Sequence, residues 1–437
     1  MWCDENGIMR LITTVVITLA LAISVALFIF SPKTSDQTQL ATANRTSEQQ
    51  AGTRYQPVGS QFKPVLTEIS VPGFKGANGI WGASGRDDEG HIWLGVSGSG
   101  KAAAHLVEYD PELNRFIDHG DPVSALRTAG VYRESEEQIK IHSKIIQMDD
   151  GWLYFASMDE TGERADGSQL PRWGSHFWRY RPSADHWEHL FSAPEGLIAV
   201  SGVGRWVYAL GYWGHVLYQY DTRTGKTGRI HVGSEGGHIS RNLVADKNGH
   251  VYVPKVKYID LKPQMDQEAK TTDRLLVIML TEYDQNLNKL QSTPLIHYAV
   301  EGKPQASHGI TSFSYLADGT IIFGTHVGYL YKITPSDQGP AAVTDLGWLH
   351  PDGKSYNPSL FPLDGKRFLA GITRRRGKGY QLFRHDINKG ESQPFDLDIP
   401  DYRHLLLYGS NTRDDKGRAY VVGRRDGNSP LLFQLEF

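Results

Sequence analysis

Asp149-Asp150-Gly151-Trp152-Leu153-Tyr154-Phe155 is a polar turn that leads directly into a short apolar and aromatic segment. After a loop, a second such segment follows as His176-Phe177-Trp178-Arg179-Tyr180. Aromatic residues suit strands, and Gly151 can take the positive φ that a tight hairpin turn requires. This motif therefore predicts two strands joined by a two-residue hairpin turn, with a third antiparallel strand after them.

Copies of this motif occur along the chain, and each copy contains a turn glycine. The seven glycines are Gly90, Gly151, Gly204, Gly249, Gly319, Gly365 and Gly417. The copies lie roughly 45 to 70 residues apart, which matches four-stranded blades joined by loops of variable length. No long stretch shows the 3.6-residue apolar period of a helical solenoid. The pattern therefore predicts an all-β fold, a seven-bladed β-propeller over residues 62–437.

The last copy lacks a fourth strand, because the sequence ends on the apolar segment Leu431–Phe437. The segment Val65–Val71, ahead of the first copy, alternates apolar and polar residues as a strand would. We expect this segment to complete the last blade and close the ring. A closed ring exposes few strand edges, so a monomer is expected.

The N-terminal part has a different character. Leu11–Phe30 is uncharged and mostly apolar, and it is long enough to cross about 30 Å of hydrocarbon. Residues 1–31 are therefore expected to be a transmembrane anchor or a signal segment, with Ala41–Ala43 as a cleavage sequence in the second case. Residues 32–61 are rich in Ser, Thr and Gln and predict a flexible linker. The propeller is thus expected outside the cytoplasm, periplasmic or at the cell surface, and either anchored or secreted.

Composition excludes several function classes. The net charge is −3 and no long basic run occurs, which argues against a nucleic-acid binder. Cys3 is the only cysteine, so the predicted propeller has no disulfide framework, thiolate zinc site or catalytic cysteine.

The repeat register predicts which side chains meet at the central channel, because inner strands of a propeller begin on one face. Nine positions before the turn glycines lie Trp81, His142, Glu195, Ser240, Ile310, Tyr356 and Tyr408. Arg241 follows one of these positions and His308 precedes another, so both are expected at the same mouth. Imidazoles, phenols and guanidinium groups around one channel suit the binding of an anion and the transfer of a proton.

Three segments carry a more particular pattern: Ile141–Ile146, Tyr154–Glu160 and Gly174–Tyr180. They resemble the propeller-fold polysaccharide lyases, above all the ulvan lyases of marine bacteria. The resemblance implies β-elimination on a uronic acid within a sulfated polysaccharide, with no cofactor required for catalysis. It also implies a histidine pair, a tyrosine, and an arginine that faces the uronate carboxylate.

By motif, the histidine pair of that family matches His142 and His176. Loop position makes Tyr258 and Arg274 the first choice for the tyrosine and the arginine, with Tyr212 and Arg241 as substitutes. His142 and Tyr258 would act as base and acid in an order left open, and His176 would position or neutralise the sugar. The substrate-binding residues expected are Arg274, Arg241, Tyr212 and His308. The long polar loop 255–273 would form a lid or a substrate wall.

Two other functions stay open. A non-catalytic propeller that binds a glycan or a protein is favoured by the ten tryptophans, since aromatic faces suit sugars. However, the mouth positions differ from blade to blade, which favours one asymmetric site. A metal- or quinone-dependent enzyme would draw on His238, His308 and His326, but no pair has the spacing of a zinc-protease motif. A structural zinc or calcium ion stays open.

Overall fold

The computed structural model describes residues 53–55, 64–164, 167–213, 215–235, 240–260, 274–299, 308–375, 377–397, 399, 401–426 and 429–437. Two compact units divide the chain, Met1–Glu48 and Gln49–Phe437. The predicted N-terminal segment 1–31 and most of the predicted linker lie outside the described residues. Within the described ranges, no helix is long and apolar enough to cross a membrane.

The unit Gln49–Phe437 is built from antiparallel sheets, so the all-β prediction is confirmed. The first sheet holds β3 (Ala77–Gly79), β5 (Ile92–Gly98), β6 (His105–Asp110) and β7 (Arg115–Asp118), with β4 (Ser84–Arg86) on β5. The second holds β8 (Lys140–Ile141), β10 (Leu153–Met158), β11 (Ser175–Arg181) and β12 (His186–Ala193), with β9 (Ile146–Gln147) on β10. Helix α2 (Pro122–Thr128) lies between them in sequence, and Pro182–Ala184 forms a 3₁₀ turn.

Three sheets of four strands follow. They are β13 (Leu197–Val203), β14 (Trp206–Gly211), β15 (Val216–Asp221) and β16 (Thr227–His231); β17 (Val244–Ala245), β18 (Val251–Asp260), β19 (Arg274–Tyr283) and β20 (Lys289–Leu295); and β21 (Ile310–Tyr315), β22 (Ile321–Thr325), β23 (Tyr329–Thr334) and β24 (Ala342–Trp348).

The last sheet has nine strands in two antiparallel parts. One part holds β25 (Tyr356–Pro362), β26 (Phe368–Arg375), β27 (Gly379–Asp386) and β28 (Glu391–Asp396). The other holds β29 (Leu405–Arg413), β30 (Ala419–Arg425), β31 (Ser429–Glu436), β2 (Val65–Ile69) and β1 (Thr53–Tyr55), with a 3₁₀ turn at Tyr402–His404. Between the described strands of the two parts, the backbone pairing is a single parallel pair, Ser359 with Ser410.

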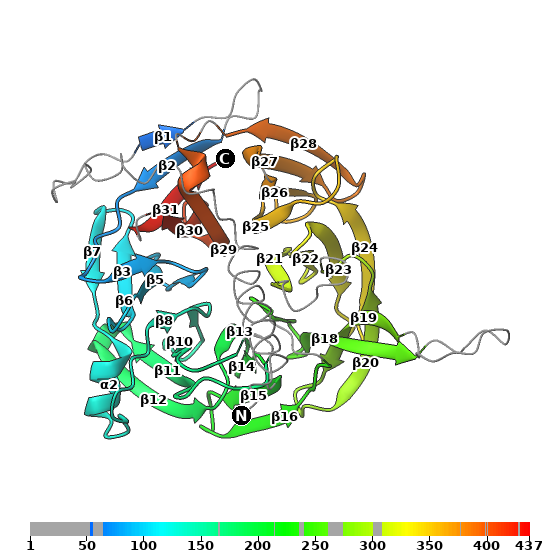
Figure 1. Cartoon of the computed structure of the whole chain (residues 1–437). Helices are drawn as coiled ribbons and strands as arrows, with labels where there is room; N and C mark the ends of the chain where they lie inside the picture. The colour runs from blue at the N-terminus through cyan, green and yellow to red at the C-terminus, as the bar shows by residue number, and fades with distance from the viewer. Residues whose placement is uncertain are drawn as a thin grey trace, which may run out of the picture. The chain divides into compact units, whose positions relative to one another are not determined.

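The sheets follow one another around a common centre (Figure 1). Inner strands contact their neighbours in chain order: β4 with β9, β9 with β13, β13 with β17, β21 with β25, β25 with β29, and β29 again with β4. The pair Asn242 and Ile310 bridges the step between β17 and β21. The core lies between adjacent sheets, where Trp93 and Trp178 are fully buried in one cluster.

Strand β2 closes the ring as predicted. It pairs antiparallel with β31, with Val65 opposite Glu436 and Ile69 opposite Leu432. Strand β1, within the range predicted as linker, pairs in turn with β2.

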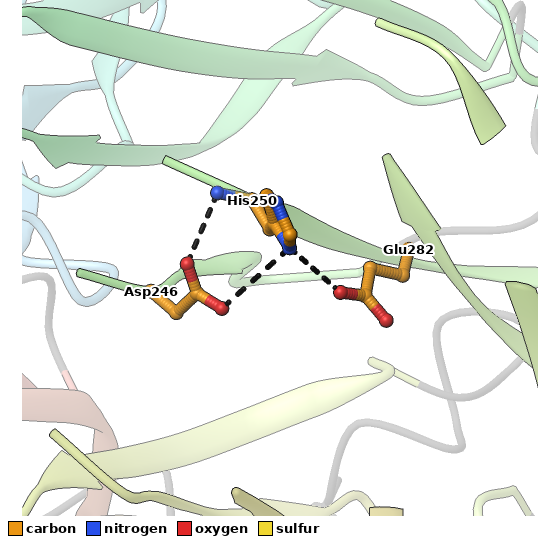
Figure 2. A group of neighbouring side chains, drawn as sticks. All are labelled: Asp246, His250 and Glu282. Carbon is orange, nitrogen blue, oxygen red and sulfur yellow. Dashed lines mark hydrogen bonds and ion pairs between the residues drawn. The ribbon is translucent and has the colours of Figure 1, made fainter. Parts of the chain in front are cut away.

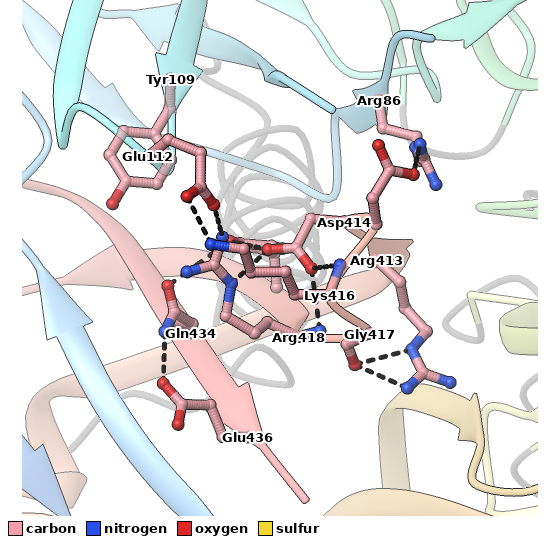
Figure 3. A network of polar contacts seen from close by, with 12 residues as sticks. Arg86, Tyr109, Glu112, Arg413, Asp414, Lys416, Gly417, Arg418, Gln434 and Glu436 are labelled. Carbon is pink, nitrogen blue, oxygen red and sulfur yellow. Dashed lines mark hydrogen bonds and ion pairs between the residues drawn. The ribbon is translucent and has the colours of Figure 1, made fainter. Parts of the chain in front are cut away.

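Polar contacts also join the first and last sheets (Figure 3). Glu112, in the turn after β6, accepts a hydrogen bond from Arg418 at 2.8 Å and pairs with Lys416. Arg86 of β4 pairs with Asp415. The two ends of the described β-unit are therefore joined by backbone pairing and by ion pairs.

The turn at Gly204 has the predicted two residues, because Val203 pairs directly with Trp206, but the turn at Gly90 differs from the prediction. Asp87 N donates to His91 O and Gly90 N donates to Asp87 O, both at 3.1 Å, and Gly90 has a φ of 88°. This is a three-residue loop that ends on a left-handed glycine, in place of the predicted two-residue turn. The extra residue lets the Asp87 carboxylate accept hydrogen bonds from two turn N–H groups, those of Glu89 and His91.

The same aspartate also ties the turn to the next strand. Its second oxygen accepts a hydrogen bond from an aromatic residue at the pattern Asp-x-x-Gly-x-x-Trp/Tyr. The three such bonds are Trp93 to Asp87 at 2.8 Å, Tyr252 to Asp246 at 2.6 Å and Tyr420 to Asp414 at 2.8 Å. These bonds fix the start of three second strands, whose other ends lie at the opposite face.

Candidate functional site

Arg241 lies at the centre of the ring, in the segment that leads into β17. Its backbone N–H donates to the carbonyl of His308 at 2.9 Å. Its Nη1 donates to His142 Nε2 at 2.9 Å and to the carbonyl of Trp81 at 3.3 Å. The guanidinium also lies over the Tyr408 ring, 4.9 Å from the centroid. Among the described residues no carboxylate forms an ion pair with it, so its charge is available to an anionic ligand.

His142 is a neutral base at this position. Its Nε2 accepts a hydrogen bond from Arg241, so the ring proton lies on Nδ1. Burial, with the positive charges of Arg241 and Lys140, holds the pKa of His142 well below its ordinary value. Nδ1 is buried and has no hydrogen-bond partner in the described part of the chain. His142 therefore holds its Nε2 lone pair on Arg241, and its Nδ1–H has no partner among the described residues.

Trp81 and Tyr408 form an aromatic wall beside Arg241. Their ring centroids lie 4.7 Å apart, and Arg424 and Lys140 lie over the Trp81 ring at 5.0 and 5.1 Å. Burial raises the pKa of Tyr408, although Arg241 and Arg424 oppose the shift. The Tyr408 hydroxyl is thus a neutral donor, and no described residue hydrogen-bonds to it.

A second group of rings lies on the other side of Arg241. His308 and His326 have centroids 5.0 Å apart, and Tyr356 lies 5.5 Å from His326. Burial and the charge of Arg241 lower the pKa of His326 to about 4 and hold that of His308 well below its ordinary value. Both imidazoles are therefore neutral at neutral pH, and the positive charge of this group comes from the arginines.

Lys144 closes the channel beneath the site. A small cavity there is lined by Trp81, Gly82, His142, Lys144, Arg241, Asn242 and Gly409. Lys144 Nζ donates to the carbonyls of Gly82 at 3.0 Å and Gly409 at 2.5 Å, and burial lowers its pKa to about 7. It also lines a second cavity of about 390 Å³, formed by the distal parts of the inner strands. The amine thus separates the two cavities.

Of the seven residues named from the sequence as catalytic or substrate-binding, the structure brings three together: His142, Arg241 and His308. The register also placed Trp81, Tyr356 and Tyr408 at the same mouth. The other four named residues lie elsewhere.

His176 lies on β11, two strands out from the segment of His142, since Ile141 pairs with Ser157 and Ser157 pairs with His176. Its ring contacts Glu136, His189 and Ser192, and no contact with His142 is found among the described residues.

Tyr212 donates its hydroxyl hydrogen to Glu163 at 2.6 Å. Burial raises the pKa of Glu163 to about 7 and raises that of Tyr212 well above its ordinary value. Glu163 lies in a loop of the second sheet and Tyr212 in a loop of the third sheet. Neither group belongs to the central site around Arg241.

Tyr258 and Arg274 belong to the far end of the β18–β19 hairpin, where Tyr258 pairs with Leu276 and Arg274 pairs with Asp260. Figure 1 shows this end of the hairpin pointing away from the ring centre. The Arg274 side chain and residues 261–273 of the predicted lid lie outside the described residues.

Sequence reasoning did not assign Arg424, Lys140, Lys144 or His326 to the central site. His326 follows the end of β22, and Arg424 lies near the end of β30. In each sheet of a propeller, the second strand ends on the face where the first strand begins. The repeat register could therefore have placed His326 and Arg424 at the central site. No sequence pattern places Lys144 at the site, because its amine contacts Gly82 and Gly409, which belong to neighbouring sheets.

Asp246, His250 and Glu282 form a group with the ligand types of a metal site (Figure 2). His250 Nδ1 lies 2.8 Å from Glu282 Oε1 and 4.0 Å from Asp246 Oδ2. In two other turns of the same pattern His91 and Arg418 take the place of His250. Arginine does not ligate metals in this way, so the shared feature is a polar contact between the turn aspartate and the residue four positions later. The donor set therefore fits this turn contact better than a zinc or calcium site.

No family model matches the chain, and no curated protein sequence matches it. Solved structures match by fold. A chain from the crystal structure of the mitotic checkpoint complex is 7% identical with a TM-score of 0.50, over 92% of this chain and 98% of that chain. The extracellular domain of a putative hybrid two-component system from B. thetaiotaomicron is 17% identical with a TM-score of 0.50, over 84% of this chain and 39% of that chain. At these identities the likeness shows the fold alone, which is β-propeller-like.

Proposed function

We propose that this chain is a seven-bladed β-propeller that cleaves a uronate-containing, sulfated, ulvan-like polysaccharide by β-elimination at the ring centre. The blade count is supported by the seven turn glycines and by the circuit of inner strands. The nine-stranded sheet counts as two blades, because the backbone pairing between its two parts is the single parallel pair of Ser359 and Ser410.

The observation that carries the activity is the Arg241 guanidinium, which faces neutral acid–base groups and has no carboxylate partner among the described residues. A guanidinium binds a carboxylate through two parallel hydrogen bonds. Neutralising the uronate carboxylate makes the adjacent C5 proton easier to remove. Arg241 would hold this carboxylate at the point where His142 and Tyr408 converge.

The geometry suggests which group is the base. When the substrate carboxylate takes the hydrogen bond of Arg241, the Nε2 lone pair of His142 is released to accept the C5 proton. The C5–H electron pair forms the C4–C5 double bond as the C4–O bond breaks. The Tyr408 hydroxyl gives its proton to the leaving oxygen, and proton exchange with water restores Tyr408 and His142. No cofactor is needed for this chemistry.

We further propose that residues 1–31 export the propeller, as an anchor or a signal segment, so that it meets polysaccharide in the periplasm or at the cell surface. The partners are an anionic polysaccharide and, where the segment is retained, the membrane. The propeller itself would act as a monomer.

The test is ultraviolet absorbance of the unsaturated uronate, which only elimination produces. The full chain would be incubated with ulvan, pectate, alginate and a heparan-type polymer. A rise with one polymer that is lost in Arg241→Ala and His142→Ala supports the proposal. Retention of a polymer on a column without any rise would instead support a non-catalytic glycan-binding propeller. That alternative is favoured by the Trp81 ring at the mouth.

A further inference from the structure

A second cluster of reactive side chains lies on the outer strands of the second sheet. Ser192 of β12 stands opposite His176 of β11, and its Oγ lies 3.1 Å from His176 Nδ1. The other ring nitrogen, Nε2, lies 2.6 Å from Glu136 Oε1. His176 and Glu136 are buried, whereas Ser192 is exposed. An accessible hydroxyl thus contacts a buried imidazole that is held by a buried carboxylate.

A β-bulge creates this arrangement. The register of β11 and β12 shifts between Phe177 and Trp178, so that Trp178 faces His189 and Phe177 faces Phe191. Leu190 is the additional residue, and it brings His189 and Ser192 to the same face of the strand. Without the bulge, side chains three positions apart would point to opposite faces.

The charges of the cluster determine the tautomer of His176. Burial opposes the ionisation of Glu136, but hydrogen bonds from His176 and Arg133 prevail and lower its pKa to about 2. An ionised carboxylate only accepts hydrogen bonds, so the His176 proton lies on Nε2. Nδ1 therefore directs its lone pair towards Ser192 Oγ, as a general base must.

We propose that Ser192, His176 and Glu136 form a second, hydrolytic centre that acts on small O-acyl esters of sugar hydroxyls. Ser192 Oγ attacks the ester carbonyl and gives its proton to His176 Nδ1. The imidazolium then protonates the departing sugar oxygen, which leaves an acyl-serine. Water attacks the acyl-serine with His176 again as base, and releases the carboxylic acid and free Ser192. Glu136 keeps the imidazole oriented and stabilises its charge.

His189 is the neighbour that competes for the same lone pair. Its Nε2 lies 2.9 Å from His176 Nδ1 and 3.4 Å from Ser192 Oγ. Burial, together with the charge that His176 carries when it is protonated, lowers the pKa of His189 to about 4, so His189 is neutral and carries one N–H. Once Ser192 donates to His176, that N–H is free to donate to the oxyanion formed on the ester carbonyl.

The position of the cluster suggests the sugar ester. Ile141, Ser157, His176 and Ser192 stand opposite one another across four successive strands. At roughly 4.8 Å per strand, Ser192 lies about 14 Å from the segment of His142. A polymer held at the ring centre would therefore bring its acyl substituents within reach. The choice of a sugar ester rests on the proposed binding of a polysaccharide at the ring centre, whereas ester hydrolysis by Ser192, His176 and Glu136 can be tested without it.

The chain contains a matched control for this centre. His385 of β27 stands opposite Ser392 of β28, and its Nδ1 lies 2.8 Å from Ser392 Oγ. The other nitrogen of His385 is buried and has no partner among the described residues. The pair thus reproduces the serine–imidazole contact without the carboxylate, although Ser392 is less exposed than Ser192, and it serves as a control for the contribution of Glu136.

The experiment combines a fluorophosphonate probe with p-nitrophenyl acetate hydrolysis by the full chain. We expect mass spectrometry to find the probe on Ser192 and not on Ser392. Hydrolysis should fall by about 100-fold or more in Ser192→Ala and Glu136→Gln, and stay unchanged in Ser392→Ala. Ser192 is exposed, so Ser192→Ala folds, and circular dichroism verifies this for each variant. An unlabelled Ser192, or equal hydrolysis by Ser192→Ala and wild type, overturns the proposal.

Discussion

The contact between the Arg241 guanidinium and the His142 imidazole sets the charge of the central site. A protonated His142 could not accept the hydrogen bond of Arg241, and burial adds a second penalty on the charged imidazole. The site therefore holds a positive guanidinium beside a neutral base. This combination suits a substrate that brings its own negative charge.

The first prediction concerns Arg241→Lys. Lysine keeps the charge but loses the planar fork that binds a carboxylate through two bonds. We expect the elimination rate on the polymer cleaved by the wild type to fall by about 100-fold or more. The exposed Arg229→Lys serves as the control, with no expected change. Wild-type kinetics in Arg241→Lys would show that Arg241 does not hold the carboxylate.

The second prediction concerns stability against pH. His326 has an ordinary pKa of 6.5 and a folded value of about 4, lowered by burial and then by Arg241. Below pH 6.5 the unfolded chain binds a proton that the folded chain does not, so stability is full above 6.5 and is lost as the pH falls towards 4. Each such histidine contributes a slope of about 1.4 kcal/mol per pH unit in this window.

Substitution of His326 by glutamine removes one of these protons. Urea unfolding at several pH values should show a shallower loss of stability in His326→Gln, by about 1.4 kcal/mol per unit between pH 6.5 and 4. Above pH 7 the slopes of the variant and the wild type should agree. Identical slopes throughout the acidic window would mean that His326 titrates normally in the folded chain.

At the scale of single elements, the aspartates Asp87, Asp246 and Asp414 each join a turn to the strand that follows it. Asp246 accepts hydrogen bonds from the backbone N–H groups of Asn248 and His250 and from the Tyr252 hydroxyl. All three donors lie on one turn and the strand that follows it. The carboxylate thus stabilises the local hairpin without any ion.

The third prediction follows from this tie. Asp246→Ala should lower the free energy of unfolding by about 1–3 kcal/mol, since a charged acceptor is lost and the Tyr252 hydroxyl stays buried without it. Asp345→Ala, on the exposed strand β24, should have little effect. A chelator should leave the melting temperature of the wild type unchanged. A chelator-induced fall would mean that Asp246, His250 and Glu282 hold a metal ion.

At the scale of the whole molecule, the ring is closed by a strand from the beginning of the β-unit. Leu66 of β2 is fully buried and pairs with Leu435 of β31. It packs in a cluster with Phe361 and Phe433, which come from β25 and β31. Loss of packing at Leu66 therefore affects the closure as well as both parts of the nine-stranded sheet.

The fourth prediction is made for this closure. Leu66→Ala should lower the free energy of unfolding by about 2–5 kcal/mol, because it removes buried methyl groups and leaves a cavity. The neighbouring Thr67→Ala is the control and should cost much less. Denaturant unfolding of both variants gives the comparison. A small effect of Leu66→Ala would mean that β2 does not contribute to the stability of the ring.

The sequence predicted the residues at the mouth of the central site better than it predicted which loop residues reach that site. Trp81, His142, Tyr356 and Tyr408 follow from one spacing, because every first strand begins on the same face. Tyr258 was assigned to the site only because it lies in a long loop. The β18–β19 hairpin that carries it points away from the ring centre. Loop direction depends on the packing of neighbouring sheets, which no local pattern encodes.

By itself, the sequence determined the repeating hairpins, the all-β class and the closing strand, predicted as Val65–Val71 and found as Val65–Ile69, because glycine turns and apolar alternation act over a few residues. Only the tertiary structure decided which charged groups meet. The contact of Arg241 with His142 joins residues far apart in sequence, and the bulge at Leu190 redirects His189 and Ser192. Side-chain contacts across the ring depend on blade positions to within an ångström, and a one-residue shift of register changes the face on which a side chain lies.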